Sequence, residues 1–236
     1  MKKKALIISL LIGLPIAAIV ISTLTTYFVV KQKNEEKINE LYKLAFEAHY
    51  HDRVNLFKEE NKNAENIDVV FLGDSLTEGY NVQSYYSEYK VLNRGIGGDT
   101  TFGVEKRLKE SVYDAHPKIT AMLIGANNFD TMLDNYENIL IDFKDKAPDM
   151  KVILLSLTSM TKNWGRNNEK AKKNNIEIEK YASKYGYYFV NLYDPLLDSN
   201  TNKLKMDYTT DGGHLTSAGY EVVTAQIKPV ISMILK

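Results

Sequence analysis

Short apolar runs recur along most of the chain, and each is followed by a polar turn and then by a segment with helical periodicity. The runs are rich in β-branched and aromatic residues and have the length of strands in a sheet that is buried on both faces. They lie at 67–73, 91–92, 119–124, 151–157 and 187–192. The segments with helical periodicity lie at about 99–111, 136–146, 169–185 and 216–233. Strands that alternate with helices predict an α/β fold, a three-layer α/β/α sandwich around a five-stranded parallel sheet.

The first 33 residues show a different pattern. Residues 5–30 carry no charge, three lysines precede them, and Lys31 and Lys33 follow them. At about 1.5 Å per residue, a helix of this length spans a hydrocarbon core of roughly 30 Å, so we predict an N-terminal transmembrane helix. A cleaved signal peptide is the alternative, but its apolar region is only about 7 to 15 residues long. The excess of lysines before the span favours a single-pass protein of the plasma membrane whose remaining residues are extracytoplasmic.

A third pattern connects this segment to the first strand. Residues 35–61 place apolar positions three and four apart with charges between them, which is typical of an amphipathic helix. His49 and His51 lie in it on different faces, so we interpret them as surface or interface residues rather than as a metal-binding pair. The predicted organisation is a membrane anchor at 1–33, a juxtamembrane helical stalk at 34–64 and a flavodoxin-like α/β domain at 65–236.

Composition and charge narrow the possible partners. Hydrophobic residues make up 44% of the 236 positions, which is enough for a sizeable core, and the formal net charge is zero. Five of the 30 basic residues but none of the 30 acidic residues lie in the first 33 positions, so the rest of the chain is mildly acidic. An acidic surface repels phosphate backbones, so we do not expect nucleic acid as a partner. The chain has no cysteine, which excludes disulfides and thiolate metal ligands.

The first strand ends in a turn that is rich in polar side chains. Gly73 closes the apolar run, and Asp74 and Ser75 follow it directly. Ligands of open α/β sheets bind at the carboxyl ends of the strands, so Ser75 is a candidate nucleophile. The alternative is that Asp74 or Ser75 only caps a following helix. The turn is not the nucleophile elbow of α/β-hydrolases, because Thr77 stands where that motif has its second glycine.

The next two strands end in turns that could supply hydrogen-bond donors. The segment 93–101 is rich in glycine and precedes a predicted helix, and backbone N–H groups at such a place suit a developing negative charge. A dinucleotide-binding motif is excluded there, because Thr100 stands where its third glycine is needed. Asn127 follows the third strand and offers a side-chain amide. Ordinary turn chemistry explains each of these segments equally well when it is taken alone.

An aspartate and a histidine lie three residues apart on a turn before the last predicted helix. There Asp211 can face His214 and fix the orientation of the imidazole, although aspartate is also an ordinary turn former. In a triad, His214 would take a proton from Ser75 as the hydroxyl attacks a carbonyl carbon. The N–H groups of Ser75 and Gly98 and the side-chain amide of Asn127 would then bind the oxyanion.

The four turns resemble the four sequence blocks of the SGNH (GDSL) hydrolases, a family of serine esterases and lipases. The matching segments are Gly73-Asp74-Ser75-Leu76, Gly97-Gly98-Asp99, Gly125-Ala126-Asn127 and Asp211-Gly212-Gly213-His214. They occur in the order that the family has, and the resemblance covers about 68–236. It implies that Ser75, Asp211 and His214 form a catalytic triad and that Gly98 and Asn127 join the oxyanion hole. The third block departs from the family pattern, since Asn128 stands where an aspartate is usual.

The predicted function is that of a membrane-anchored extracytoplasmic serine hydrolase that cleaves carboxylic esters through an acyl-enzyme, without a metal or organic cofactor. O-acetyl esters on envelope glycans are the expected substrates, because Trp164 lies in a polar loop and could stack on a sugar. Packing of Trp164 against the next helix is the alternative, and Asp74 is a further candidate substrate contact. Two other functions stay open, a lysophospholipase or lipase-type acylhydrolase and a non-catalytic surface glycan-binding module. The sequence indicates no oligomeric state.

Overall fold

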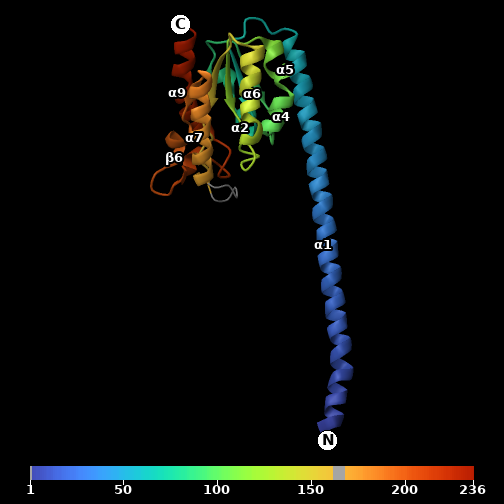
Figure 1. Cartoon of the computed structure of the whole chain (residues 1–236). Helices are drawn as coiled ribbons and strands as arrows, with labels where there is room; N and C mark the ends of the chain where they lie inside the picture. Colours follow the sequence, from blue (N-terminus) through green and yellow to red (C-terminus); the bar gives the residue numbers. More distant parts are fainter. Residues whose placement is uncertain (1, 162–167) are drawn as a thin grey trace. The chain divides into compact units, whose positions relative to one another are not determined.

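The computed structural model describes residues 2–161 and 168–236, with side chains from residue 22 onward (Figure 1). Its contacts divide the chain into two compact units, 1–48 and 49–236, and each is described by itself. The first unit consists of helix α1 (Lys2–Asn61) as far as residue 48. Nearly all of its described side chains are exposed. Its charged residues pair four positions apart, Lys31 with Glu35 and Lys43 with Glu47.

The predicted membrane span, 5–30, lies largely outside the residues whose side chains are described. Among the described residues, none of the helices combines the length and the apolar character that crossing a bilayer requires. The transmembrane helix therefore stays a prediction.

The second unit is built on a five-stranded sheet in which neighbouring strands are parallel. The spatial order is β2-β1-β3-β4-β5, which is the order of flavodoxin-like doubly wound folds. The register places Gly73, at the end of β1, beside Gly95 of β2 and Leu123 of β3. The strands are β1 (Val69–Gly73), β2 (Val91–Gly95), β3 (Ile119–Leu123), β4 (Lys151–Leu155) and β5 (Tyr188–Val190). The predicted five-stranded parallel sheet is confirmed.

Helices cover both faces of this sheet, because successive side chains of a strand point to opposite faces. Four helices lie on one side of the sheet (Figure 1), α4 (Thr101–Lys106), α5 (Leu108–Ser111), α6 (Leu133–Lys146) and α7 (Asn168–Tyr185). Val70 and Leu72 pack in one core with residues of these helices. Val69 and Phe71 pack in a second core against α9 (Ser217–Ile234). The predicted three-layer sandwich is therefore confirmed.

Shorter elements join these layers. They are α2 (Ser75–Glu78), α3 (Val82–Tyr85), η1 (Tyr113–Ala115), α8 (Tyr193–Leu196), β6 (Leu197–Asp198), β7 (Lys203–Leu204) and η3 (Met206–Tyr208). Strands β6 and β7 form a separate antiparallel pair. The helix predicted at 99–111 is interrupted at Arg107, which separates α4 from α5.

Strand β2 is longer than the sequence predicted. The polar residues Asn93 and Arg94 indicated a turn after the apolar pair at 91–92, yet the strand continues to Gly95. Asn93 Nδ2 donates to the carbonyl of Tyr80 at 2.9 Å, and Arg94 pairs with Glu60. Polar groups can lie in a buried strand when each finds a partner. These partners come from distant segments, which the local pattern does not reveal.

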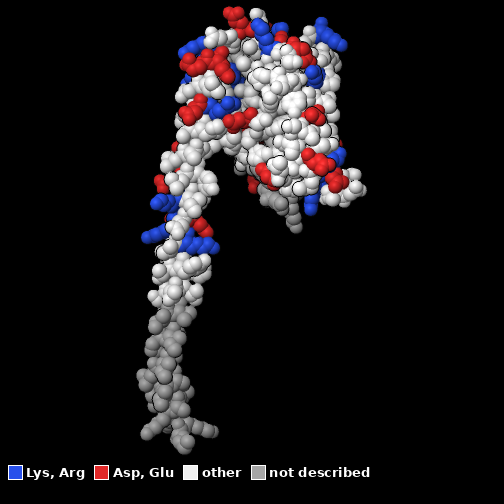
Figure 2. Space-filling model, turned by 180° about the vertical axis from the view of Figure 1, so that it is seen from behind, with Lys and Arg blue, Asp and Glu red and all other residues white. Residues whose placement is uncertain are grey.

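Basic and acidic side chains are intermixed on the face of the second unit that Figure 2 shows. Ion pairs of this unit include Lys118 with Asp68 and Lys228 with Glu88, each at 2.7 Å. Such exposed pairs contribute little, so the two cores contribute far more to the stability of the unit.

Candidate active site

The loop after β1 presents the candidate nucleophile at the carboxyl edge of the sheet. Strand β1 ends at Gly73, and the short helix α2 begins at Ser75. Asp74 is buried and caps this helix, since its Oδ1 accepts a hydrogen bond from the N–H of Leu76 at 3.1 Å. The capping role that the sequence left open between two residues therefore belongs to Asp74, and the hydroxyl of Ser75 faces His214 instead.

His214 lies within hydrogen-bonding distance of the other two residues of the predicted triad. His214 Nε2 is 3.0 Å from Ser75 Oγ, and His214 Nδ1 is 2.7 Å from Asp211 Oδ2. The other carboxylate oxygen of Asp211 accepts from the N–H groups of Gly213 and His214 at 2.9 and 2.8 Å. Burial acts to raise the pKa of Asp211, but the hydrogen bonds from the His214 ring and the two N–H groups lower the pKa to about 2. The carboxylate therefore stays ionised and can stabilise an imidazolium.

The turn that carries His214 is fastened to the body through its backbone. Thr209 Oγ1 donates to the carbonyl of His214 at 2.6 Å and accepts from the N–H of Gly212 at 2.9 Å. Gly212 has a φ of +93°, and a Cβ at this position would lie 1.8 Å from Thr161 Oγ1, so only glycine fits. The N–H of Thr161 donates to the carbonyl of Gly212 at 2.8 Å. These contacts hold the imidazole in place before any substrate arrives.

The other two predicted oxyanion donors follow the strands on either side of β1. Gly98 comes after β2 and Asn127 after β3, so the strand order places both loops next to the loop of Ser75. Gly98 has a φ of +81°, a conformation that glycine adopts without strain. Asn127 Nδ2 donates to the carbonyl of Asp99 at 2.8 Å, which links the two loops directly. The backbone N–H of Ser75 opens α2, where helical hydrogen bonding leaves donors unused. Binding of an oxyanion by this set stays a prediction.

Asn128, the departure from the family pattern, joins the same loops. Its Nδ2 donates to Thr101 Oγ1 at 2.8 Å, and its Oδ1 accepts from the N–H of Thr101 at 3.3 Å. The Thr101 hydroxyl in turn donates to Asn135 Oδ1 at 2.6 Å. An aspartate at position 128 could accept but not donate, whereas the amide can donate to a hydroxyl whose hydrogen is already used. Asn128 therefore fits the hydrogen bonds that connect the third block to the start of α4.

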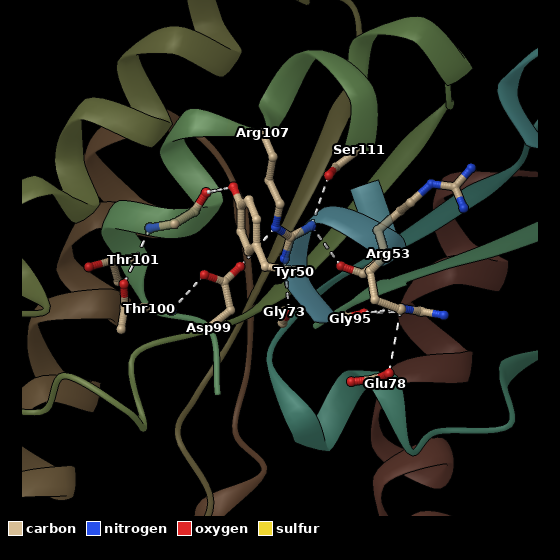
Figure 3. Close-up of polar contacts among 12 residues, drawn as sticks. Tyr50, Arg53, Gly73, Glu78, Gly95, Asp99, Thr100, Thr101, Arg107 and Ser111 are labelled. Carbon is tan, nitrogen blue, oxygen red and sulfur yellow. Dashed lines mark hydrogen bonds and ion pairs between the residues drawn. The ribbon is translucent and has the colours of Figure 1, made fainter. Parts of the chain in front are cut away.

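A buried ion pair beneath these loops was missed by the sequence analysis. Arg107 Nε donates to Asp99 Oδ2 at 2.8 Å, and both side chains are 1% exposed. The same guanidinium donates to the carbonyls of Gly73 and Arg94 at 2.9 Å and to Ser111 Oγ at 2.8 Å (Figure 3). Burial raises the pKa of Asp99 and lowers the pKa of Arg107, while their mutual attraction opposes both shifts. Arg107 thus holds the ends of β1 and β2 together below the candidate site.

One sequence signal could have revealed this pair. Arg107 lies three residues after Val104 and four before Ser111, on the face of the predicted helix that points into the core. A charged residue on a buried face requires a partner. The sequence alone does not identify Asp99 as that partner.

The remaining predicted site residues have different positions. Asp74 lines a small cavity together with Ser75 and His214, so contact with a substrate stays a prediction. Trp164 lies outside the described residues, and its role also stays a prediction. His49, interpreted as a surface or interface residue, lies with its Nε2 3.1 Å from Glu78 Oε2. In the parts of the chain that the structure describes, no group of three or more histidine, aspartate or glutamate side chains is arranged to hold a metal ion.

Comparison with known proteins identifies the family. The profile of the GDSL-like lipase/acylhydrolase family matches residues 71–222, which is more than half of the chain. The platelet-activating factor acetylhydrolase IB subunit alpha2 of Homo sapiens and of Rattus norvegicus is 34% identical over 99 residues. This match covers 38% of the present chain and 43% of the relative, so it spans less than half the length of these curated proteins.

Solved structures share the fold over most of the chain. A structure from Streptococcus pneumonia, described as that of a platelet activating factor, superposes with a TM-score of 0.76 at 26% identity and covers 81% of this chain and 97% of that chain. A GDSL-like lipase from Bacteroides thetaiotaomicron superposes with a TM-score of 0.68 at 27% identity and covers 76% and 97%. From the profile match, these structures and the four blocks gathered at one sheet edge, it follows that the chain belongs to the GDSL-like lipase/acylhydrolase family of serine ester hydrolases.

Proposed function

We propose that this protein hydrolyses short-chain carboxylic esters through an acyl-enzyme, with O-acetyl esters on envelope glycans as its substrates. The observation that carries the proposal is the 3.0 Å contact between Ser75 Oγ and His214 Nε2, with Asp211 behind the imidazole. Ser75 attacks the carbonyl carbon while His214 takes its proton, and His214 then gives that proton to the leaving alcohol. A water molecule, deprotonated by the same imidazole, hydrolyses the acyl-enzyme and restores Ser75.

Negative charge develops on the substrate carbonyl oxygen in both steps. The N–H groups of Ser75 and Gly98 and the side-chain amide of Asn127 are the donors that we assign to it. Each such donor contributes a factor of about 10² to 10³ in rate. All three belong to loops that follow the adjacent strands β2, β1 and β3, which supports a shared binding position.

The size of the cavity beside the triad supports the proposal that the acyl group is small. Its volume is about 10 Å³, roughly that needed for one water molecule. Leu76, Ala126 and Met160 form its apolar walls. A methyl group suits a space of this size better than an octanoyl chain does. The name acetylhydrolase of the curated relatives agrees with a short acyl group, so lipase-type hydrolysis of long acyl chains is the less favoured function.

We propose the alcohol part of the substrate from the predicted location of the protein at the membrane. Residues 5–30 would anchor the protein in the plasma membrane as a single span, with the hydrolase domain outside. Envelope glycans are within reach of a domain held there. Membrane lipids are equally near, so lysophospholipids remain the alternative substrates. A non-catalytic glycan-binding module is disfavoured because nucleophile, base and carboxylate are all present and in contact.

Substitution of the nucleophile tests the reaction. Ser75→Ala in the full chain, purified in detergent, should reduce turnover of p-nitrophenyl acetate by about 10⁴ to 10⁶. A fluorophosphonate should label the wild type and not this variant. Ser84→Ala, which changes an exposed serine of α3, is the matched control and should keep wild-type activity and labelling. A Ser75→Ala variant with the wild-type rate would show that the proposed chemistry is wrong.

A series of acyl chain lengths tests the substrate class. We expect acetyl esters to be preferred over octanoyl esters by at least about tenfold in kcat/KM. Met160→Ala should enlarge the cavity and raise the ratio of butyryl to acetyl hydrolysis, whereas Met206→Ala, at an exposed position, should not. Acetylated glycans and lysophospholipids are then compared by mass spectrometry of the released acid. A preference for octanoyl esters would refute the acetyl assignment and favour the lipase-type alternative.

A further inference from the structure

The last turns of α1, residues 49–61, pack against the loop that follows β2. Phe57 is fully buried there and forms a small apolar cluster with Ile96. The guanidinium groups of Arg53 and Arg94 lie over the Phe57 ring at 5.0 and 4.7 Å from its centroid. Cations stacked on a buried ring are attracted by its quadrupole, which fixes both arginines in place. The sequence analysis assigned these turns to a stalk, but here they contribute to the fold of the second unit.

Two side chains hold the backbone of the loop after β2. Arg53 donates to the carbonyl of Gly95 through Nε at 3.2 Å and Nη2 at 2.9 Å (Figure 3). Glu78 Oε2 accepts a hydrogen bond from the N–H of Gly97 at 2.5 Å. Glu78 is itself held from α1, because Arg53 Nε lies 3.5 Å from its Oε1 and His49 Nε2 lies 3.1 Å from its Oε2. The loop is therefore fixed on both sides of Ile96.

Glu78 also belongs to the helix of the nucleophile. Helix α2 begins at Ser75 and ends at Glu78. A Cβ on Gly97 would lie 3.0 Å from Glu78 Oε2 and 3.9 Å from the Cβ of Ser75, so Gly97 is a neighbour of both. One short helix thus carries the attacking hydroxyl at its start and, at its end, a carboxylate that holds the neighbour of Gly98.

The loop needs such a restraint because it contains two consecutive glycines. Gly97 and Gly98 have access to a wide range of backbone conformations. An oxyanion donor accelerates the reaction only if its N–H already points at the position where the charge develops. Fixing the N–H of Gly97 limits the conformations of the peptide that follows it, and this peptide carries the N–H of Gly98.

We propose that Glu78, held by Arg53 and His49, is a positioning residue that keeps the Gly98 N–H directed at the oxyanion. The inference rests on the proposed ester hydrolysis and adds to it a residue outside the triad and the oxyanion donors. Glu78 acts through Gly97 and touches no reacting atom. Its side chain is 27% exposed and borders an open cavity of about 340 Å³, so truncating it creates no buried void.

The test compares two substitutions of Glu78 in the full chain, purified in detergent. Glu78→Ala removes the carboxylate that accepts from the Gly97 N–H and should lower kcat for p-nitrophenyl acetate by about 10 to 100-fold. This loss is smaller than that caused by removing a whole oxyanion donor. KM should change less than about twofold. Glu78→Gln keeps an amide oxygen that can accept from Gly97, so its kcat should recover to within about fivefold of wild type. Rates are normalised to the fraction of enzyme that a fluorophosphonate labels.

A tetrahedral inhibitor separates positioning from a general loss of structure. Methylboronic acid forms a tetrahedral adduct with a serine hydroxyl and places an oxygen in the oxyanion hole. Its inhibition constant should rise in Glu78→Ala by the factor by which kcat/KM falls, and by less in Glu78→Gln. Arg53→Gln removes the contacts of Arg53 with both Gly95 and Glu78, so kcat should fall and the inhibition constant of methylboronic acid should rise in this variant too. It replaces Glu78→Ala in the test if that variant folds poorly. Glu59→Ala, which changes an exposed glutamate of α1 that pairs with Lys62, is the matched control and should match the wild type.

The outcomes distinguish this inference from the proposed function. If Ser75→Ala is inactive but Glu78→Ala turns over within twofold of wild type, the positioning role is wrong and ester hydrolysis stands. A fall in kcat without any change in the inhibition constant of methylboronic acid also refutes positioning. If Ser75→Ala retains the wild-type rate, the ester hydrolysis itself is wrong.

Discussion

The buried ion pair between Arg107 and Asp99 offers a sharp test of what holds the site together. Arg107→Met keeps an apolar stem of similar shape but removes a guanidinium that is 1% exposed and donates to four groups. The Asp99 carboxylate then stays buried without its counterion. Removing one partner of such a pair lowers the free energy of unfolding by about 3 to 5 kcal/mol. At about 2 to 4 °C per kcal/mol for a domain of this size, the unfolding temperature should fall by about 6 to 20 °C.

A double-mutant cycle isolates the pair from other effects. Asp99→Asn should destabilise the protein by a similar amount, because it leaves the Arg107 charge without its partner. The double variant should be more stable than the sum of the two losses predicts, by about 1 to 3 kcal/mol, because no unpaired buried charge remains. Unfolding of the full chain in detergent is followed by the near-ultraviolet circular dichroism of its 16 tyrosines. Lys109→Met is the control, since Lys109 is 71% exposed and pairs at the surface.

Two results would show that the ion pair does not act in this way. If Arg107→Met lowers the unfolding temperature by less than about 2 °C, or no more than Lys109→Met, the pair does not support the fold. Additive losses within about 0.5 kcal/mol would show that the two charges act independently.

Three further predictions concern residues around the site. Asn128→Asp, which installs the residue usual in the family, should lower the unfolding free energy by about 1 to 2 kcal/mol because a carboxylate cannot donate to the Thr101 hydroxyl; an unchanged unfolding temperature would contradict this. The pKa of Asp211 is lowered to about 2 in the folded protein, so its carboxylate stabilises the fold above the unfolded pKa of about 3.9, and this contribution is lost as the pH falls towards 2. Asp211→Asn should therefore be less stable than wild type at pH 5 to 7, by about 1 kcal/mol or less because Asp211 is 43% exposed. Urea unfolding should show that this difference in stability disappears near pH 2. A difference that stays constant with pH would exclude the ionised carboxylate as its origin. Phe57→Ala should destabilise the protein by about 3 to 5 kcal/mol and reduce kcat as well. Phe102→Ala, at an exposed position, should do neither. Equal effects of the two substitutions would argue against a structural role of the end of α1.

The sequence predicts the sheet and the triad because both depend on local signals. Four of the five strands lie in largely apolar runs, whereas β2 continues through Asn93 and Arg94. Ser75, Asn127 and His214 each follow a recognisable strand end or turn. The rule that parallel strands gather their carboxyl ends at one edge is enough to bring the first two of these together. The three-residue spacing of Asp211 and His214 on a turn identifies the base, and the family resemblance supports it. The structure places His214 Nε2 3.0 Å from Ser75 Oγ.

The supporting contacts could not be predicted, because they depend on pairs far apart in the chain. Glu78 is separated from Gly97, whose N–H it accepts, by 19 positions and from His49 by 29. Arg53 reaches the carbonyl of Gly95 across 42 positions. Nothing in the neighbourhood of these charges distinguishes them from solvated residues of amphipathic helices. For the same reason the sequence placed the start of the α/β domain at 65, whereas the contacts of the second unit begin at 49.

The small cavity beside Ser75 has walls from different segments of the chain. In the proposed reaction, the segments after β1, β2 and β3 and the turn before α9 supply the groups that act on the carbonyl, while Met160, one wall of the small cavity, comes from the segment after β4. We therefore expect substitutions of Met160 to alter which acyl group is accepted without removing a group that we assign to ester cleavage. During evolution, substitutions in the segment after β4 could change the substrate specificity while the catalytic residues stay the same.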